Sequence, residues 1–394
     1  MIHYLDELLQ QAIQRGASDL HFEPYAEHYR IRFRIDGILY EVARPPLQQA
    51  SQIAARLKVM AQLDIAERRL PQDGRLQLSS PQHGSVDFRI STLPTQHGEK
   101  IVLRVQQQAT AIPGLEQLGL TESQQTLYRQ ALHQPQGMIL VTGPTGSGKT
   151  LTLYAGLALL NTSSRNIATA EDPVEMSVPG VNQVAIHVKT GLTFSHALRA
   201  FLRQDPDVIM VGEIRDQDTA EIAVKAAQTG HLVLSTLHTN SAAEAVIRLQ
   251  QMGLAAYNLA SSLQFIIAQR LARCLCQACK APELLPAAEL TRQGLNHPDL
   301  PPLNLYQAVG CDHCTDGYRA RIGIFEVLPM TPVLRDLILQ QASATAIQTY
   351  AAEAGFIHLR TAALMHVAAG VMSLAEANRV VGHGITSAAA AGTP

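Results

Sequence analysis

The stretch 136–150, QGMILVTGPTGSGKT, constrains the fold of this chain more than any other segment. An apolar run leads directly into the pattern Gly143-x-x-x-x-Gly148-Lys149-Thr150, and the helix-compatible LTLYAGLALL follows it. This order predicts a buried parallel strand, a phosphate-binding loop and a helix. Chance would give the pattern in roughly one chain in a hundred of this length, so a glycine-rich turn without a ligand is the weaker interpretation.

Each residue type in the loop meets a physical need of phosphate binding. Glycines permit positive φ and carry no Cβ, so backbone N–H groups can turn inward around phosphate oxygens. Lys149 supplies a positive charge for the β- and γ-phosphates, and Thr150 supplies a hydroxyl for Mg²⁺. The expected ligand is a nucleoside triphosphate with Mg²⁺. The residues expected to hold it are Gly143, Pro144, Thr145, Gly146, Ser147, Gly148, Lys149, Thr150 and Leu151.

Length and charge limit the remaining possibilities. A chain of 394 residues predicts two or three domains, and a net charge of −2 gives no reason to expect bulk affinity for nucleic acid or anionic lipid. The sequence has no apolar run of about 18 residues, and its N-terminus carries acids where a signal peptide needs positive charge. We therefore expect a cytoplasmic protein that meets a membrane only through partners.

Residues 1–105 predict a small α+β domain. Helical spacing of apolar residues covers 1–15 and 48–63, and alternating stretches predict strands at 19–24, 29–34, 38–42, 75–79, 86–91 and 99–105. Residues 106–120 lack periodicity and contain Pro113-Gly114, which predicts a linker.

Residues 121–394 predict a second, α/β domain. Strands are expected at 166–170, 181–186, 208–211 and 231–235, with helices at 195–203 and 218–228 between them. This alternation predicts a parallel sheet with helices on both faces, and places ligand chemistry at the carboxyl ends of the strands.

Acidic residues follow two of these strands. Glu171 and Asp172 follow one, and Gly212-Glu213 follows the apolar run VIMV. Because Gly212 occupies the usual aspartate position, Glu213 is the expected water-activating base, and Glu171 or Asp172 is a further candidate for Mg²⁺ beside Thr150. The alternative for each acid is a solvated loop residue. Several polar clusters at the ends of consecutive strands of one sheet make this alternative less favoured.

Two histidines bracket the next strand. His238 either senses the γ-phosphate or bonds a backbone carbonyl, and the residues leave both open. His231 is predicted to be functional.

Four cysteines form two CxxC pairs, Cys276/Cys279 and Cys311/Cys314. Four thiolates are the tetrahedral set that Zn²⁺ prefers, so residues 270–325 are expected to be a structural zinc-binding insertion; reduced, metal-free thiols are the alternative. Cys274 is not expected to be a ligand. Residues 331–385 show helical spacing and predict an all-helical C-terminal lobe.

Arginines recur on the predicted strands of the first domain, at Arg32, Arg34, Arg75, Arg89 and Arg104. They are either solvated surface residues or groups that reach the phosphates of a neighbouring subunit, as arginine fingers do.

The succession ASDLHFEP, RIDG, LPQDGR, GPTGSGKT, EDPVE, RQDPDVIMVGEIRD, TGHLVLSTLHTN and paired CxxC resembles the type II secretion and type IV pilus assembly ATPases over nearly the whole chain. The resemblance implies ATP as the nucleotide, a PAS-like domain, a RecA-like domain with a zinc-binding insertion, a hexamer and a polytopic inner-membrane platform protein as partner. It implies that Glu171 and Glu213 are the acidic-box and Walker B glutamates, that His231 and His238 form a histidine box, and that the CxxC cysteines bind zinc. It singles out Arg89 and Arg104 as arginines reaching nucleotide across a subunit boundary.

Two departures refine this expectation. Many members of the family have a further N-terminal domain that docks on adaptors, and here the sequence begins at the PAS-like domain. Pilus retraction ATPases generally lack paired CxxC motifs, so their presence favours assembly or secretion over retraction. Two rival classes are a RecA-type nucleic-acid motor, disfavoured by the near-neutral charge, and an ATP-binding scaffold that does not turn over.

Overall fold

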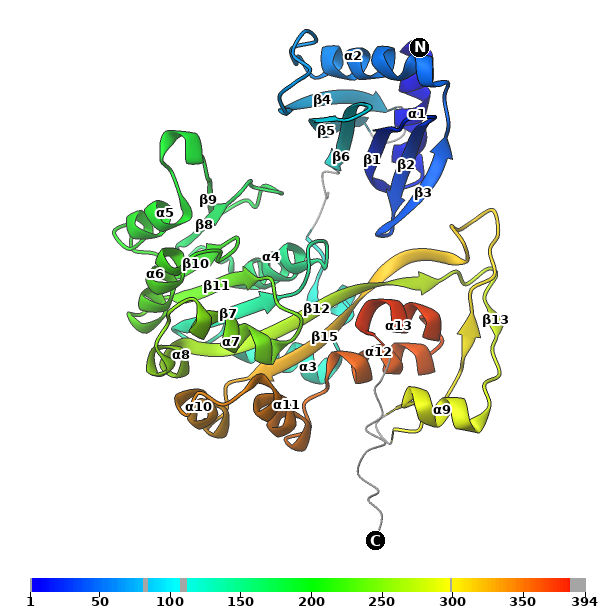
Figure 1. The fold of residues 1–394 in the computed structure, drawn as a ribbon. Helices are drawn as coiled ribbons and strands as arrows, with labels where there is room; N and C mark the ends of the chain where they lie inside the picture. Colours follow the sequence, from blue (N-terminus) through cyan, green and yellow to red (C-terminus); the bar gives the residue numbers. More distant parts are fainter. Residues whose placement is uncertain (1, 81–83, 107–111, 298–299, 383–394) are drawn as a thin grey trace. The chain divides into compact units, whose positions relative to one another are not determined.

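The computed structural model describes residues 2–80, 84–106, 112–297 and 300–382 (Figure 1). The chain divides into two units, residues 1–110 and 111–394. Of the predicted linker, residues 107–111 lie outside the described residues, as do residues 383–385 of the predicted helical lobe.

The first unit is a six-stranded antiparallel sheet with two helices. Its strands are β1 (Ala17–Pro24), β2 (Tyr29–Ile35), β3 (Ile38–Ala43), β4 (Gln72–Ser80), β5 (Gly84–Thr95) and β6 (Gly98–Gln106), in the order β3-β2-β1-β6-β5-β4. The helices are α1 (Ile2–Gln14) and α2 (Ala50–Met60). Every strand and helix predicted from the alternation is present, so the α+β expectation for this part of the chain is confirmed.

The period-two pattern of β2 explains how this sheet acquires one dry face. Tyr29, Ile31, Phe33 and Ile35 are buried in one core together with apolar residues of α1 and α2, whereas the alternate positions carry arginines. Burying each large apolar side chain contributes about 1.5–3 kcal/mol. Strand alternation therefore gathers the charged side chains on the opposite face.

The second unit contains a seven-stranded sheet. Its strands are β7 (Gly137–Thr142), β8 (Ile167–Glu171), β9 (Asn182–Ala185), β10 (Val208–Val211), β11 (Leu232–Leu237), β12 (Leu263–Leu275) and β15 (Tyr318–Pro329), in the order β15-β12-β7-β11-β10-β8-β9. All neighbours are parallel except β12 and β15, which pair antiparallel. The α/β fold with a parallel sheet is confirmed.

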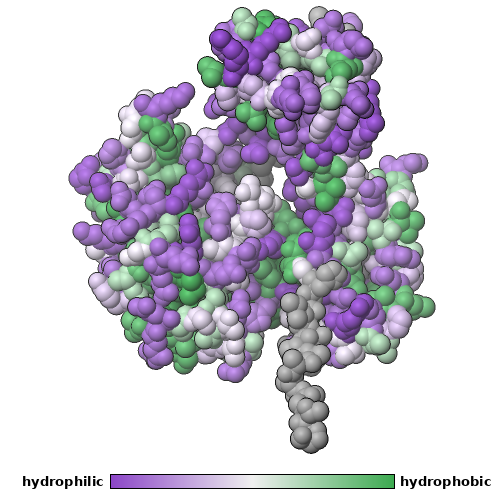
Figure 2. Space-filling view, in the orientation of Figure 1, coloured by the Kyte–Doolittle hydropathy of each residue, from purple (hydrophilic) through white to green (hydrophobic). Residues whose placement is uncertain are grey.

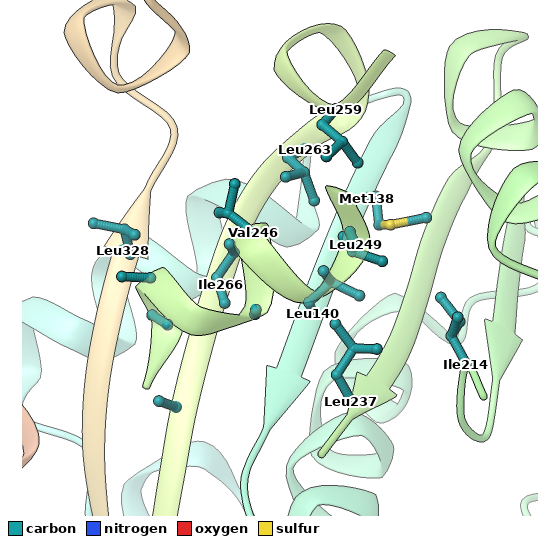
Figure 3. Packing of buried hydrophobic residues seen from close by; sticks show 14 of the residues in the cluster. Met138, Leu140, Ile214, Leu237, Val246, Leu249, Leu259, Leu263, Ile266 and Leu328 are labelled. Atoms are coloured by element: carbon teal, nitrogen blue, oxygen red, sulfur yellow. The ribbon is translucent and has the colours of Figure 1, made fainter. Parts of the chain in front are cut away.

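Helices cover both faces of this sheet. Met138 and Leu140 of β7 face one core, and Ile139 and Val141 face the other. Figure 3 shows the first core, where Met138 and Leu140 meet Leu249. The helices on that side are α5 (Phe194–Phe201), α6 (Gln217–Gln228), α7 (Ala242–Gln251) and α8 (Ala256–Ser262); α3 (Glu122–Leu132) and α4 (Lys149–Leu160) lie on the other. This two-sided burial explains why β7 is apolar throughout.

The sheet's edge carries the cysteine insertion and the helical lobe. Between β12 and β15 lie β13 (Ala281–Pro282), α9 (Ala287–Gln293) and β14 (Tyr306–Gln307). After β15 follow α10 (Pro332–Leu339), α11 (Ala344–Glu353), α12 (Leu359–Ala368) and α13 (Leu374–Val381), whose apolar sides extend the first core. The helical lobe is therefore confirmed over its described residues.

Hydrophilic residues predominate on the face shown in Figure 2, with apolar residues in small separate patches. None of the helices in the described part of the chain combines the length and the apolar composition that crossing a bilayer requires.

Candidate nucleotide-binding site

The phosphate-binding loop joins the carboxyl end of β7 to the first residue of α4, as its sequence predicts. Gly148 adopts φ +85° and is the N-cap residue of α4. A Cβ on Gly148 would lie 2.9 Å from Nε2 of Gln269, and one on Gly143 would lie 2.6 Å from Oγ of Ser147. Glycine is therefore required at both positions. Gly148 has a backbone conformation that other residues rarely adopt, and Gly143 has no room for a Cβ. The N-terminus of α4, a twelve-residue helix, points at the centre of the loop, where a phosphate would lie.

Two buried polar groups of the loop indicate a ligand. The Lys149 side chain is largely buried, and its Nζ donates to the carbonyls of Gly143 (2.8 Å) and Pro144 (3.0 Å). The Ser147 hydroxyl is buried and has no hydrogen-bond partner within the described residues. Thr150 is exposed, so its hydroxyl is free to face a metal ion. These residues fit a nucleoside triphosphate with Mg²⁺, because phosphate oxygens would accept hydrogen bonds from the Ser147 hydroxyl and the Lys149 ammonium.

Burial lowers the pKa of Lys149 to about 8, and the positive charge of Arg270 acts in the same direction. The carboxylate of Glu213 opposes both. An anion beside Lys149 would favour its charged form, so phosphate binding and protonation of this lysine are coupled.

Glu213 lies where β10 ends, and its side chain is 15% exposed. Its Oε1 is 2.5 Å from Nη2 of Arg215, and its Oε2 is 3.3 Å from Nε2 of His238. The pairing with Glu213 raises the pKa of Arg215. Because β7, β10 and β11 are parallel strands of one sheet, Glu213, His238 and the phosphate loop lie along the same edge.

Glu171 has a different environment. It ends β8 and is only 3% exposed. Its Oε2 accepts from the Tyr154 hydroxyl, and its Oε1 accepts from Thr169 Oγ1 (2.5 Å) and Gln183 Nε2 (3.1 Å). Oε2 thus joins β8 to α4, and Oε1 is held by side chains of β8 and β9. Asp172, by contrast, is exposed. Direct metal ligation by Glu171 would require it to exchange these partners.

The two histidines lie at opposite ends of β11 (Leu232–Leu237), as their positions on either side of the predicted strand indicate. His231 precedes β11, its Nδ1 lies 3.0 Å from the carbonyl of Ala226, and its own carbonyl accepts from the first residue of β7. His238 follows the other end of β11. A six-residue strand separates its two ends by roughly 20 Å. His231 is therefore at the edge remote from the phosphate loop of its own chain.

Arg89 and Arg104 belong to the first unit and are directly opposite each other on β5 and β6. The Nε of Arg104 donates to Oδ1 of Asp19 at 3.0 Å, and the Arg104 side chain is 62% exposed. Arg75 is opposite Arg89 on the other side. These three arginines form a cross-strand row on the face away from the core.

Sequence reasoning missed Gln269 and Arg270 of β12. The Gln269 amide accepts from Thr152 Oγ1 of α4 at 2.8 Å, which supports the helix that begins at the phosphate loop. Arg270 Nη2 donates to the carbonyl of Asn240 at 2.9 Å, in the segment that follows His238. Recognising the apolar run 265–268 as the strand beside β7 would have identified both.

The four predicted cysteine ligands converge at the ends of β12 and β15. Their sulfur atoms all lie within 4.8 Å of one another, with Sγ–Sγ distances of 3.9 Å (Cys276–Cys311), 3.7 Å (Cys279–Cys314) and 3.7 Å (Cys311–Cys314). A tetrahedral Zn²⁺ with bonds of about 2.3 Å places its sulfur ligands about 3.8 Å apart. The backbone N–H groups of Gly310 and Cys311 also donate to cysteine sulfur at 3.3 Å. The cluster fits zinc, which would cross-link the insertion.

The strand–loop–helix arrangement with an acid and a histidine at the same sheet edge defines a P-loop nucleoside triphosphatase. Residues 1–379 match the family described as "Type II/IV secretion system protein", and the chain belongs to this family of secretion and pilus-assembly ATPases.

Among its relatives, the type IV pilus assembly ATPase PilB of Pseudomonas aeruginosa is 56% identical over 96% of this chain and 67% of that protein. The type II secretion system ATPase E of Vibrio cholerae is 46% identical over 96% of this chain and 75% of that protein. The chain thus spans about two thirds of the length of the pilus assembly relative.

Two solved structures share the fold of this chain. The pilus retraction motor PilT with bound ADP has a TM-score of 0.61 at 27% identity, covering 95% of this chain and 96% of that one. The ATPase DotB of Legionella pneumophila has a TM-score of 0.67 at 21% identity, covering 95% and 94%, and shares the fold.

Proposed function

We propose that this chain is the ATP-hydrolysing motor of a type IV pilus assembly system. The observation that carries the proposal is the placement of Lys149, Glu213 and His238 along one edge of the sheet. The higher identity to PilB (56%) than to the type II secretion ATPase (46%) favours pilus assembly over secretion.

The residues have distinct roles in this proposal. The loop amides and the Ser147 hydroxyl receive the phosphates, and Lys149 Nζ leaves the carbonyls of Gly143 and Pro144 to meet them. Thr150 would hold Mg²⁺, which would supply positive charge beside the phosphates. Glu213, oriented by its contacts with Arg215 and His238, positions the attacking water. Because His238 pairs with Glu213 and lies between β11 and α7, it would connect the γ-phosphate site to the segment before α7.

The arginine row supports a site completed by a neighbouring subunit. Like charges directly opposite each other destabilise a sheet, and here Arg75, Arg89 and Arg104 follow one another across three strands. Asp19 balances Arg104 in part. A nucleotide held by the next subunit of a hexamer would offset the remaining repulsion, so Arg89 and Arg104 are proposed to act across that boundary.

Loss of the γ-phosphate would then remove the contacts that Lys149 and the neighbouring subunit's arginines are proposed to make with it. The resulting rigid-body motion is proposed to act on a polytopic platform protein of the inner membrane. Binding to that partner is proposed to hold the motor at the cytoplasmic side of the membrane.

A mixing experiment tests the shared site. Lys149→Ala subunits lack nucleotide binding but keep Arg104, and Arg104→Ala subunits have the opposite defect. Each variant alone should be inactive, and an equimolar mixture should recover up to about a quarter of wild-type ATPase activity, since a quarter of the subunit boundaries carry both groups.

Arg44→Ala is the matched control, because Arg44 is also 62% exposed and ion-paired in the same unit, to Glu41. It should retain activity by itself. A fully active Arg104→Ala protein, or a mixture no more active than its two components, would refute the shared site.

A further inference from the structure

The first unit contains a cavity that the proposed ATPase cycle does not use. Its volume is about 430 Å³, and all its lining residues lie between residues 24 and 99. It is bounded by α2, the segment after α2, the turn after β1 and the hairpin between β5 and β6. Cavities that hold small ligands typically have volumes of about 300–1,000 Å³, so this one has the size of a ligand site.

A buried cation lines this cavity. The Lys58 side chain is 1% exposed, pairs with the carboxylate of Glu99 and donates to the carbonyl of Glu67 at 2.7 Å. An ammonium has three donors, and these contacts account for two of them among the described residues. Lys58 therefore retains one buried N–H that an acceptor can satisfy.

A second buried donor lines the same cavity. Tyr29 is 1% exposed, and its hydroxyl has no hydrogen-bond partner within the described residues. Burial raises the pKa of Tyr29, so the phenol stays protonated and donates. An unsatisfied buried hydroxyl is uncommon and destabilising, and a ligand oxygen would remove that cost.

The walls combine planar apolar surface with further positive charge. Tyr25, Leu47 and Pro94 are among the lining residues, and the Tyr25 ring is fixed by stacking on His28 at 4.7 Å. Arg68 is exposed and lies at the rim. Lys58 and Arg68 outnumber the single lining carboxylate, Glu99. The lining thus favours a negative group attached to a flat apolar body.

We propose that this cavity binds a small organic anion, with its carboxylate or phosphate directed to Lys58, Tyr29 and Arg68 and its planar apolar part against Tyr25 and Pro94. The site lies wholly within the first unit and is separate from the phosphate loop, so the ligand adds a second input to the protein.

Three probes with one shared ring system test this site: 1-naphthoate, 1-naphthyl phosphate and the neutral 1-naphthalenemethanol. Calorimetric titration uses the full chain with a saturating non-hydrolysable ATP analogue, which occupies the phosphate loop. At least one anion should bind at least tenfold more tightly than the alcohol. The preferred anion identifies the head group as carboxylate or phosphate.

Variants locate the binding. Tyr29→Phe removes only the unpartnered hydroxyl, so its melting temperature should not fall, while affinity for the anion should drop at least fivefold. Arg68→Gln should weaken the anion in the same direction. Arg69→Gln is the matched control, since Arg69 is adjacent and exposed but does not line the cavity, and it should leave affinity unchanged.

The proposal is overturned if neither anion binds below 10 mM, if the alcohol binds as tightly as the anions, or if Tyr29→Phe and Arg68→Gln bind like the wild type.

Discussion

Lys149 shows at the scale of one residue how the loop is prepared for an anion. Its ammonium is buried, and its described hydrogen-bond partners are two carbonyls of its own loop. A hydrogen bond from the Lys149 ammonium to a charged phosphate is stronger than one to a neutral carbonyl. Exchanging the two carbonyls for phosphate oxygens therefore favours nucleotide binding.

This environment predicts a pH dependence of nucleotide affinity. Burial holds the pKa of free Lys149 at about 8, and bound phosphate raises it, so binding takes up a proton above that pH. Affinity for a non-hydrolysable ATP analogue should fall by no more than about twofold from pH 7 to 8 and then weaken by up to about tenfold per pH unit. Titration calorimetry at several pH values measures this slope.

Lys149→Arg is the control for this slope, because arginine stays charged throughout the range. Its affinity should not change between pH 8 and 9. If the affinity of the wild type and of Lys149→Arg falls equally with pH, a group other than Lys149 causes the pH dependence.

At the scale of elements, Glu376 joins the helical lobe to the sheet. It lies in the first turn of α13, is fully buried, and pairs with Arg273 of β12 and Arg379. Burial alone would raise the pKa of Glu376, but hydrogen bonds from Arg379 and Arg273 lower it to about 2. Its stabilisation is thus complete above the unfolded pKa of about 4.5 and is lost as the pH falls toward 2.

Glu376→Gln should lower the melting temperature of the full chain by roughly 5–10 °C at pH 7, because it removes the buried carboxylate that pairs with Arg273, whose side chain is only 12% exposed. Glu353→Gln, at the exposed end of α11, should shift it by less than about 2 °C. The difference between the two variants should shrink when melting is repeated near pH 3. Equal melting temperatures at pH 7 would contradict this role.

The cysteine cluster predicts a metal content. Purified protein should contain about one zinc per chain, and Cys311→Ser should lose most of it with a lower melting temperature, because structural zinc contributes directly to folding. Elemental analysis measures the content. Cys274→Ser is the matched control and should retain the metal; a Cys311→Ser protein with full zinc would rule out this ligand set.

The elements also show what the sequence could predict. Strand alternation in residues 17–106 and the strand–helix alternation in residues 137–237 carry clear periodicity, and the structure has those elements. The long strands β12 and β15 were not predicted, because apolar runs buried on both faces lack a period that separates strand from helix. For the same reason Gln269 and Arg270 were missed. His231 and His238 were predicted to bracket one strand, and β11 lies between them, but motif order does not state what either histidine contacts.

For the whole molecule, we propose that an oligomer hydrolyses ATP with Glu213 as its catalytic carboxylate. The two units each have their own core, so a cycle of nucleotide binding and release can act by moving one relative to the other. The family assignment gives the class of activity, and the position of Glu213 beside His238 gives the residue to test.

The most direct test is the steady-state ATPase rate of the purified full chain across a protein concentration series, beside Glu213→Gln. Activity per subunit should rise steeply with concentration, because the proposed site needs arginines from a neighbouring subunit. Glu213→Gln should lose at least about a hundredfold. Activity per subunit that is independent of concentration, or a Glu213→Gln protein as active as the wild type, would contradict the account.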